Sequence, residues 1–198
     1  MSDRRKALIT GASRGIGRAI CVKLASEGTD IVFSYRSGDE AASKTVNLCR
    51  EYGIEIHAIK ADVSDSEECE RLIKEAVDLL GGRIDILVNN AGLIKRNDAI
   101  DFTEDEWDSV IQVNQKMVFF LSQAFAKQYI KQGHGGKIIN INSMLSYQGG
   151  IRVPSYTASK SAGMGLTKAM CNEWACHNIN VNAIAPGYMA TNNTAQLR

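Results

Sequence analysis

The sequence predicts a single α/β domain built on a doubly wound, parallel sheet of the Rossmann type. Short apolar runs alternate with longer amphipathic stretches along the chain, a pattern typical of strands that alternate with helices. Crossovers of this length join parallel strands in a right-handed sense. A glycine-rich turn directly follows the first apolar run, where such sheets begin their first helix. We therefore expect one domain over residues 1–198 with the strand order 3-2-1-4-5-6.

The expected elements follow from this alternation. The expected strands are residues 7–10, 31–33, 56–59, 84–88, 137–141 and 179–184. The expected helices are residues 18–27, 39–52, 64–80, 103–131 and 156–177. Ser64 and Glu67 have the spacing of a capping box, so we place a helix start at Ser64. Glycines at 133–136 end the long helix, and the Pro186-Gly187 pair stops the last strand.

Composition excludes several classes of function. The net charge is +1 and both signs are scattered, which argues against nucleic acid and membrane-surface partners. The chain has five cysteines without the close pairing of a zinc knuckle or redox dithiol, so we expect reduced thiols and no metal site. No apolar run is long enough to span a bilayer or to resemble a signal peptide. We expect a soluble, cytoplasmic protein that acts on a small molecule.

The glycine turn at residues 10–17 is the first candidate binding site. Its spacing is Gly-x3-Gly-x-Gly, and it lies between the first strand and the first helix. Glycine allows the backbone to turn sharply and approach a pyrophosphate, which the helix N-terminus then attracts. A purely structural turn is the alternative, but the position favours a nucleotide. The candidate cofactor ligands here are Gly11, Ser13, Arg14, Gly15, Ile16 and Gly17.

The end of the second strand bears on the identity of the cofactor. An acid at this place favours the ribose 2′-hydroxyl of NAD, and an arginine favours the 2′-phosphate of NADP. The strand runs into Arg36 without an acid at its tip, and Arg14 lies in the neighbouring glycine turn. We therefore expect NADP(H) rather than NAD(H). Asp39 and Glu40 follow closely, so NAD(H) stays open as the alternative.

Tyr156, Lys160 and Ser143 form the candidate catalytic group. Four positions separate the tyrosine from the lysine, so both side chains lie on one face of a helix. A nearby ammonium lowers the pKa of a phenol and makes it a usable acid or base. Ser143 closes the fifth strand, at the carboxyl edge where such sheets bind ligands. A tyrosine-lysine pair alone is more often a surface pair, and its position after the serine and the glycine turn favours catalysis.

With these motifs in order, the chain resembles the short-chain dehydrogenase/reductases over essentially its whole length. The resemblance is carried by the glycine turn, by Asn-Asn-Ala-Gly at 89–92, and by Asn114, Ser143, Tyr156 and Lys160 in sequence order. It implies that Tyr156 is the general acid or base and that Ser143 orients the reacting oxygen. It also implies that Lys160 binds the nicotinamide ribose and lowers the tyrosine pKa. Asn114 would hold a water that serves as a proton relay.

The same resemblance extends the cofactor site. Asp62 and Val63 match the pair that contacts adenine in this family. The further cofactor residues that it implies are Asn89, Ala91, Gly92, Tyr156, Lys160, Pro186, Gly187, Met189 and Thr191.

Two segments bear on the substrate. Residues 143–156 and 178–194 are similar to 2-deoxy-D-gluconate 3-dehydrogenases and, more distantly, to gluconate 5-dehydrogenases. Arg152 would then pair with a sugar-acid carboxylate beside Ser143 and Tyr156, unless it is an ordinary loop cation. The N-terminal half is instead similar to 3-oxoacyl-(acyl-carrier-protein) reductases. We expect hydride transfer to or from a sugar acid, with the reductase activity as an alternative.

The chain ends at Arg198. The resemblance implies a substrate-covering helical segment, a last helix and a last parallel strand, and we expect these C-terminal parts to be missing here. A nucleotide-binding regulator or scaffold without turnover is therefore a third hypothesis. The resemblance also implies a homodimer or homotetramer assembled through the two long helices.

Overall fold

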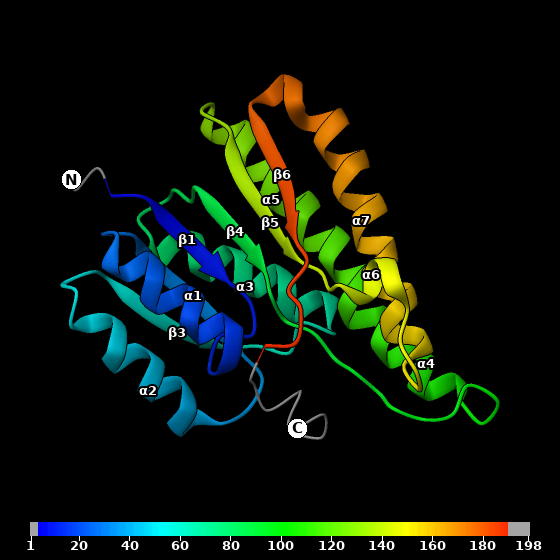
Figure 1. Cartoon of the computed structure of the whole chain (residues 1–198). Helices are drawn as coiled ribbons and strands as arrows, with labels where there is room; N and C mark the ends of the chain where they lie inside the picture. Colours follow the sequence, from blue (N-terminus) through cyan, green and yellow to red (C-terminus); the bar gives the residue numbers. More distant parts are fainter. Residues whose placement is uncertain (1–3, 190–198) are drawn as a thin grey trace.

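A parallel sheet forms the centre of the computed structural model, which describes residues 4–189 (Figure 1). The sheet has six strands in the order β3-β2-β1-β4-β5-β6, and every neighbouring pair is parallel. The strands are β1 (Lys6–Ile9), β2 (Asp30–Tyr35), β3 (Ile56–Lys60), β4 (Ile86–Asn89), β5 (Gly136–Ile141) and β6 (Ile179–Ile184). The predicted fold class and strand order are confirmed.

Helices connect the strands as right-handed crossovers require. They are α1 (Gly15–Ser26), α2 (Asp39–Arg50), α3 (Ser66–Leu79), α4 (Glu104–Ile111), the π-helical turn η1 (Gln112–Lys116), α5 (Met117–Gln132), α6 (Leu145–Gln148), α7 (Pro154–Trp174) and the 3-10 turn η2 (Ala175–His177). Helix α1 begins at Gly15, inside the glycine turn, three residues before the expected start. The short helix α6 has no counterpart in the sequence-based prediction.

The two faces of the sheet bury separate apolar clusters. Because side chains alternate along a strand, Leu8 and Val32 face one side while Ile9 and Phe33 face the other. Helices α3, α5 and α7 pack on the first face, and α1 and α2 cover the second (Figure 1). Strands buried on both faces are typical of parallel sheets. This packing fixes the carboxyl ends of β1, β2, β4 and β5, from which the site is built.

The start of α3 differs from the prediction. Asp65 caps this helix, because its carboxylate accepts a hydrogen bond from the Glu67 backbone N–H at 2.8 Å. The Ser64 hydroxyl instead donates to the Asp62 carboxylate at 2.8 Å. The capping box expected at Ser64 is therefore wrong. A capping box does occur at α4, between Thr103 and Glu106.

The helix expected over residues 103–131 is interrupted. Helices α4 and α5 are joined by η1, in which one extra residue is accommodated per turn. Asn114 lies at the centre of η1 and is buried. Single π-helical turns occur frequently at functional sites, because they redirect one side chain out of the regular helix register. Here the redirected side chain hydrogen-bonds Leu93, a residue that lines the cavity described below.

No helix within residues 4–189 combines the length and apolar character needed to cross a bilayer.

Candidate active site

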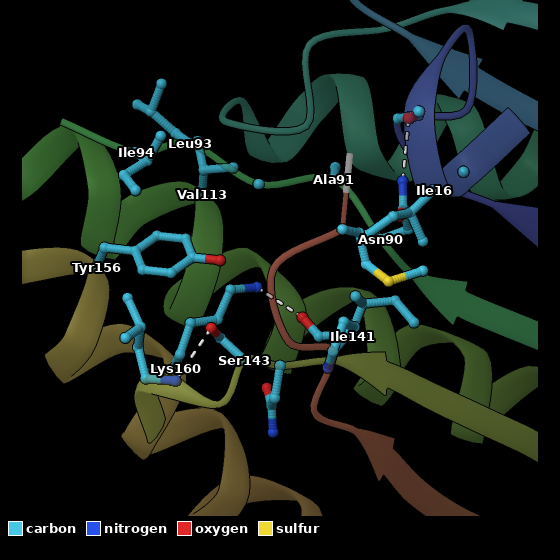
Figure 2. Close-up of a pocket in the computed structure, with 18 of the residues that line it drawn as sticks. Ile16, Asn90, Ala91, Leu93, Ile94, Val113, Ile141, Ser143, Tyr156 and Lys160 are labelled. Atoms are coloured by element: carbon cyan, nitrogen blue, oxygen red, sulfur yellow. Dashed lines mark hydrogen bonds between the residues drawn. The ribbon is translucent and has the colours of Figure 1, made fainter. Parts of the chain in front are cut away.

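A cavity of about 730 Å³ lies at the carboxyl ends of the strands. Figure 2 shows Tyr156, Lys160 and Ser143 on one side of it and Ile16, Asn90 and Ala91 on the other. The predicted cofactor residues that line it are Gly11, Ser13, Arg14, Gly15, Ile16, Gly17, Arg36, Asp62, Val63, Ala91, Gly92, Tyr156, Lys160, Pro186, Gly187 and Met189. Segments far apart in the sequence thus meet at the edge where doubly wound sheets bind ligands.

The glycine turn is shaped by close backbone contacts. Gly11 has a φ angle of +66°, and a Cβ atom on it would lie 2.8 Å from the Ala91 Cα. The Asn90 side-chain amide donates to the carbonyl oxygens of Thr10 at 2.9 Å and Gly11 at 3.0 Å, which ties the turn to the end of β4. Only glycine fits at position 11 without moving this backbone. No sequence motif predicted this role for the Asn90 side chain.

The N-terminus of α1 suits an anion. Arg14, at its N-cap position, makes no side-chain capping hydrogen bond, and the first turn carries no acidic residue. The backbone N–H groups of a first helical turn have no partner within the helix, and they carry partial positive charge. Beside them, the Arg18 guanidinium donates to the carbonyl oxygens of Ser13 and Ala41 and so supports the turn from outside the cavity. The arrangement fits the pyrophosphate of a dinucleotide.

Near the end of β2, basic side chains line the cavity and the acidic side chains do not. Arg14 and Arg36 both line the cavity, whereas Asp39 and Glu40 do not. The Asp39 carboxylate pairs with the Lys60 ammonium at 3.1 Å instead. Asp39 and Glu40, which left NAD(H) as the alternative cofactor, therefore lie outside the lining of the cavity.

Lys160 is a buried cation at the catalytic end. Its side chain rises from α7, and its ammonium donates to the Ile141 carbonyl oxygen at 2.6 Å. Only 5% of the residue is exposed, and burial lowers the pKa of the lysine from 10.5 to about 8, because leaving water penalises the charged form. The same ammonium lies 5.7 Å from the centroid of the Tyr156 ring.

Tyr156 experiences opposing influences. Burial raises the pKa of its phenol, while the Ser143 hydroxyl and the positive charge of Arg96 act to lower it. The resemblance implied that Lys160 supplies the charge that lowers this pKa. In the protein alone that charge comes from Arg96, which also lines the cavity and which the sequence did not single out. Arg96 lies in the irregular loop between β4 and α4, where no periodicity marks a residue as facing inward.

Asn114 links three parts of the catalytic end. Its carboxamide oxygen accepts from the Leu93 N–H at 2.8 Å, and its amide nitrogen donates to the Leu93 carbonyl at 2.8 Å and to the Ser159 hydroxyl at 3.1 Å. The Ser159 hydroxyl in turn donates to the Tyr156 carbonyl at 2.8 Å. Asn114 therefore fixes the loop after β4 against the start of α7. Its proposed proton relay is a separate role that this geometry leaves as a prediction.

The family model for short chain dehydrogenases matches residues 5–198. The chain belongs to the short chain dehydrogenase family. It is an oxidoreductase with a fold that binds a nicotinamide cofactor, as the motifs and their order predicted.

Relatives of this chain include both a sugar-acid dehydrogenase and a 3-oxoacyl reductase. A 2-dehydro-3-deoxy-D-gluconate 5-dehydrogenase from Dickeya dadantii is 57% identical over 192 residues, which are 97% of this chain and 74% of that protein. A 3-oxoacyl-(acyl-carrier-protein) reductase from Staphylococcus aureus is 40% identical over 197 residues, covering all of this chain and 79% of that one.

A solved structure supports the same grouping. It is that of a proposed 2-deoxy-D-gluconate 3-dehydrogenase from Agrobacterium tumefaciens with bound NADP. That protein is 47% identical to this chain and superposes with a TM-score of 0.85, over 100% of this chain and 77% of the other.

Asn89 and Arg152, two of the predicted site residues of this dehydrogenase, do not line the cavity. Asn89 is turned into the protein, where its amide donates to Ser122 at 3.0 Å and to Asn140 at 2.9 Å. Arg152 lies outside the cavity lining, and its guanidinium pairs with Asp98 at 2.9 Å. Thr191 falls outside the described residues. The two hydrogen bonds of Asn89 connect β4 to β5 and α5.

No group of three or more His, Cys, Asp or Glu side chains is arranged to hold a metal ion within residues 4–189.

Proposed function

We propose that this dehydrogenase interconverts a carbonyl and a secondary alcohol on a sugar acid of the deoxygluconate or gluconate type, with NADP(H) as cofactor. One observation carries the proposal: a single cavity has an anion-binding glycine turn at one end and the Ser143, Tyr156 and Lys160 side chains at the other. A cavity of about 730 Å³ accommodates a dinucleotide and leaves room at its catalytic end for a small substrate.

When bound, the nicotinamide supplies or accepts the hydride. The chain's own residues manage the oxygen of the substrate. Ser143 hydrogen-bonds this oxygen, and Tyr156 donates a proton to it in reduction or removes one in oxidation. The Ser143 hydroxyl acts to lower the pKa of the Tyr156 phenol, which supports a position of the two groups on the same substrate oxygen. Lys160 holds positive charge beneath the ring and binds the cofactor ribose, in addition to its hydrogen bond with the Ile141 carbonyl.

Substitution of Tyr156 tests the acid-base assignment. Tyr156→Phe keeps the ring and removes the hydroxyl, so we expect kcat to fall by about 10²- to 10⁴-fold, the usual contribution of a positioned acid or base. The affinity for NADPH, followed by its fluorescence, should change little. Tyr147→Phe is the matched control, because Tyr147 is 65% exposed and does not line the cavity. Substantial activity of Tyr156→Phe would refute the assignment, and tight NADPH binding by a wild-type protein without turnover would favour a regulator or scaffold.

The preference for NADP(H) rests on Arg14 and Arg36, which line the cavity at the end of β2. A charge-assisted hydrogen bond to phosphate contributes about 1.5–3 kcal/mol, so Arg36→Asp should weaken NADPH binding about ten- to hundredfold. NADH serves as the internal control, because it lacks the 2′-phosphate. Equal losses for both cofactors would refute this assignment.

The choice of a sugar acid rests on Arg96. This side chain lines the cavity close enough to Tyr156 to influence its pKa, which is where the carboxylate of a short substrate would come to lie. We expect Arg96→Met to raise KM for a sugar acid about tenfold or more, and to raise KM for a neutral polyol much less. The neighbouring Lys95→Met is the control, because Lys95 is exposed and does not line the cavity. Equal effects of Arg96→Met on both substrates would refute the role.

A 3-oxoacyl-thioester reductase is the second candidate. Apolar side chains at the catalytic end favour it, namely Leu93, Ile94 and Val113, which Figure 2 places near Tyr156. An acyl chain would bury apolar surface against them. A substrate panel of sugar acids and 3-oxoacyl thioesters, assayed with both cofactors, separates the two activities by their kcat/KM.

Assembly into a homodimer or homotetramer and a cytoplasmic location complete the proposal. Trp107 on α4 is 40% exposed and Phe120 on α5 is 45% exposed, and such side chains favour burial between subunits. Light scattering on the purified protein measures the mass of the assembly.

A further inference from the structure

Two loops border the catalytic end of the cavity and contact each other at its mouth. The first, residues 93–101, follows β4 and carries Arg96 into the cavity wall. The second, residues 149–153, precedes α7 and lines the cavity with Gly149, Gly150, Ile151 and Val153. Arg152, inside the second loop, points away from the cavity toward the first loop, where it pairs with Asp98.

Both the backbone and the side chain of Arg152 take part in this contact. The Asn97 N–H donates to the Arg152 carbonyl oxygen at 3.1 Å. The Arg152 guanidinium reaches the Asp98 carboxylate at 2.9 Å. Arg152 adopts a φ angle of +63°, which residues other than glycine rarely do. A strained backbone of this kind persists where surrounding contacts hold it, and here the contacts are those with the first loop.

The first loop is also held at its two ends. Leu93 exchanges two hydrogen bonds with Asn114, both 2.8 Å long. The Asn97 side chain donates to the Asp101 carbonyl at 3.1 Å and to the Glu106 carboxylate at 3.3 Å. Arg96 therefore lies between a fixed residue at 93 and a fixed residue at 97. Asn97 and Asp98, the next residues of this loop, connect it across the mouth to Arg152.

We propose that Asp98 and Arg152 are positioning residues that latch these two loops together and thereby hold Arg96 in place for the substrate. Arg152 then acts on the substrate indirectly, through Asp98 and the loop, and not as a carboxylate ligand. The effect on substrate affinity rests on the function proposed above, whereas the latch itself can be tested in the protein without substrate.

Amide hydrogen exchange tests the latch directly. Exchange over residues 93–101 is measured by mass spectrometry in wild type, Asp98→Asn, Arg152→Met and the charge swap Asp98→Arg/Arg152→Asp. An exposed ion pair contributes about 0.2–1 kcal/mol, so each single variant should exchange up to about fivefold faster in this segment. The charge swap should restore protection. Asp101→Asn is the matched control, because it makes the same chemical change in the same loop on an exposed carboxylate.

Steady-state kinetics with a sugar acid then test the consequence. Each single variant should raise KM by about two- to fivefold with kcat nearly unchanged, and combining Asp98→Asn with Arg152→Met should add little, because both remove one contact. The charge swap should return KM to within about twofold of wild type.

The outcomes distinguish three cases. An increase in KM for Arg152→Met alone, with no effect of Asp98→Asn and no recovery in the charge swap, would show direct binding by Arg152 and overturn the proposal. Unchanged hydrogen exchange in both single variants would also overturn it. Faster exchange in both, in a protein that turns over no sugar acid, would support the latch and refute the proposed function.

Discussion

The burial of the Lys160 ammonium predicts a measurable dependence of folding stability on pH. The pKa of Lys160 is 10.5 in the unfolded chain and about 8 in the folded protein. Below pH 8 the lysine is protonated in both states, and the full cost of burying the ammonium is present. Between pH 8 and 10.5 the unfolded chain binds more protons than the folded protein, so folding stability rises with pH in this window.

The magnitude follows from the pKa shift. One pKa unit corresponds to 1.36 kcal/mol, so a buried ammonium with this shift lowers folding stability by about 3 kcal/mol at neutral pH. Lys160→Met keeps most of the side-chain volume and removes the charge, and it also removes the hydrogen bond to Ile141. The lost hydrogen bond offsets part of the gain at every pH, by about 1–3 kcal/mol. The difference in the free energy of unfolding, variant minus wild type, should therefore fall by about 2 kcal/mol between pH 8 and 10.

Urea unfolding of the two proteins at pH 7, 8, 9 and 10 measures this difference. Cysteines and tyrosines that titrate in the same range are present in both proteins, so their contributions cancel in the comparison. Lys168→Met provides the baseline, because Lys168 is an exposed lysine on the same helix. A stability difference for Lys160→Met that stays constant, or that grows in favour of the variant as pH rises, would refute the argument from burial.

Three further predictions concern the scaffold. Gly17→Ala should destabilise the protein by about 1–3 kcal/mol in urea unfolding, because its Cβ would lie 2.7 Å from backbone of the glycine turn. Gly165→Ala, which has open space around its Cβ, should instead stabilise helix α7 by up to about 1 kcal/mol, and similar effects of both would contradict this. Thr103→Ala should cost about 1 kcal/mol through loss of the α4 capping box, and Ser64→Ala should cost less. Iodoacetamide should modify the exposed Cys176 at neutral pH, and mass spectrometry should find the buried cysteines of α1, α2 and α3 unmodified, because burial raises the pKa of their thiols.

The sequence predicts the sheet well because local and global signals agree there. Each strand is a short apolar run, each connection has the length of a crossover, and the handedness rule leaves few arrangements. The capping error at α3 shows the limit of local spacing. Ser64 and Asp65 are both good capping residues, and the choice depends on Asp62, whose carboxylate takes the Ser64 hydroxyl as its partner. The four-residue capping-box pattern, which runs from Ser64 to Glu67, does not include Asp62.

Parts of the site could not be predicted, because contacts between distant segments create them. The π-helical turn at Asn114 is accompanied by hydrogen bonds to Leu93 and Ser159, which lie 21 and 45 positions away. Arg96 faces the cavity from a loop without periodicity. Arg152 was predicted to bind a sugar-acid carboxylate because it lies beside the active site in a segment similar to sugar-acid dehydrogenases, but its side chain pairs with Asp98.

The electrostatics of the catalytic end explain why the recognised motif is not sufficient by itself. Burial opposes the charged form of both partners, since it lowers the pKa of Lys160 and raises that of Tyr156. Lys160 is nevertheless protonated below pH 8, with its ammonium 5.7 Å from the centroid of the Tyr156 ring. Additional charge comes from Arg96, outside the motif, and the Ser143 hydroxyl also acts to lower the pKa of the phenol. It follows that the loop that carries Arg96 contributes positive charge near the tyrosine, and a residue that fixes this loop, as we propose for Asp98 and Arg152, acts mainly on where the substrate binds.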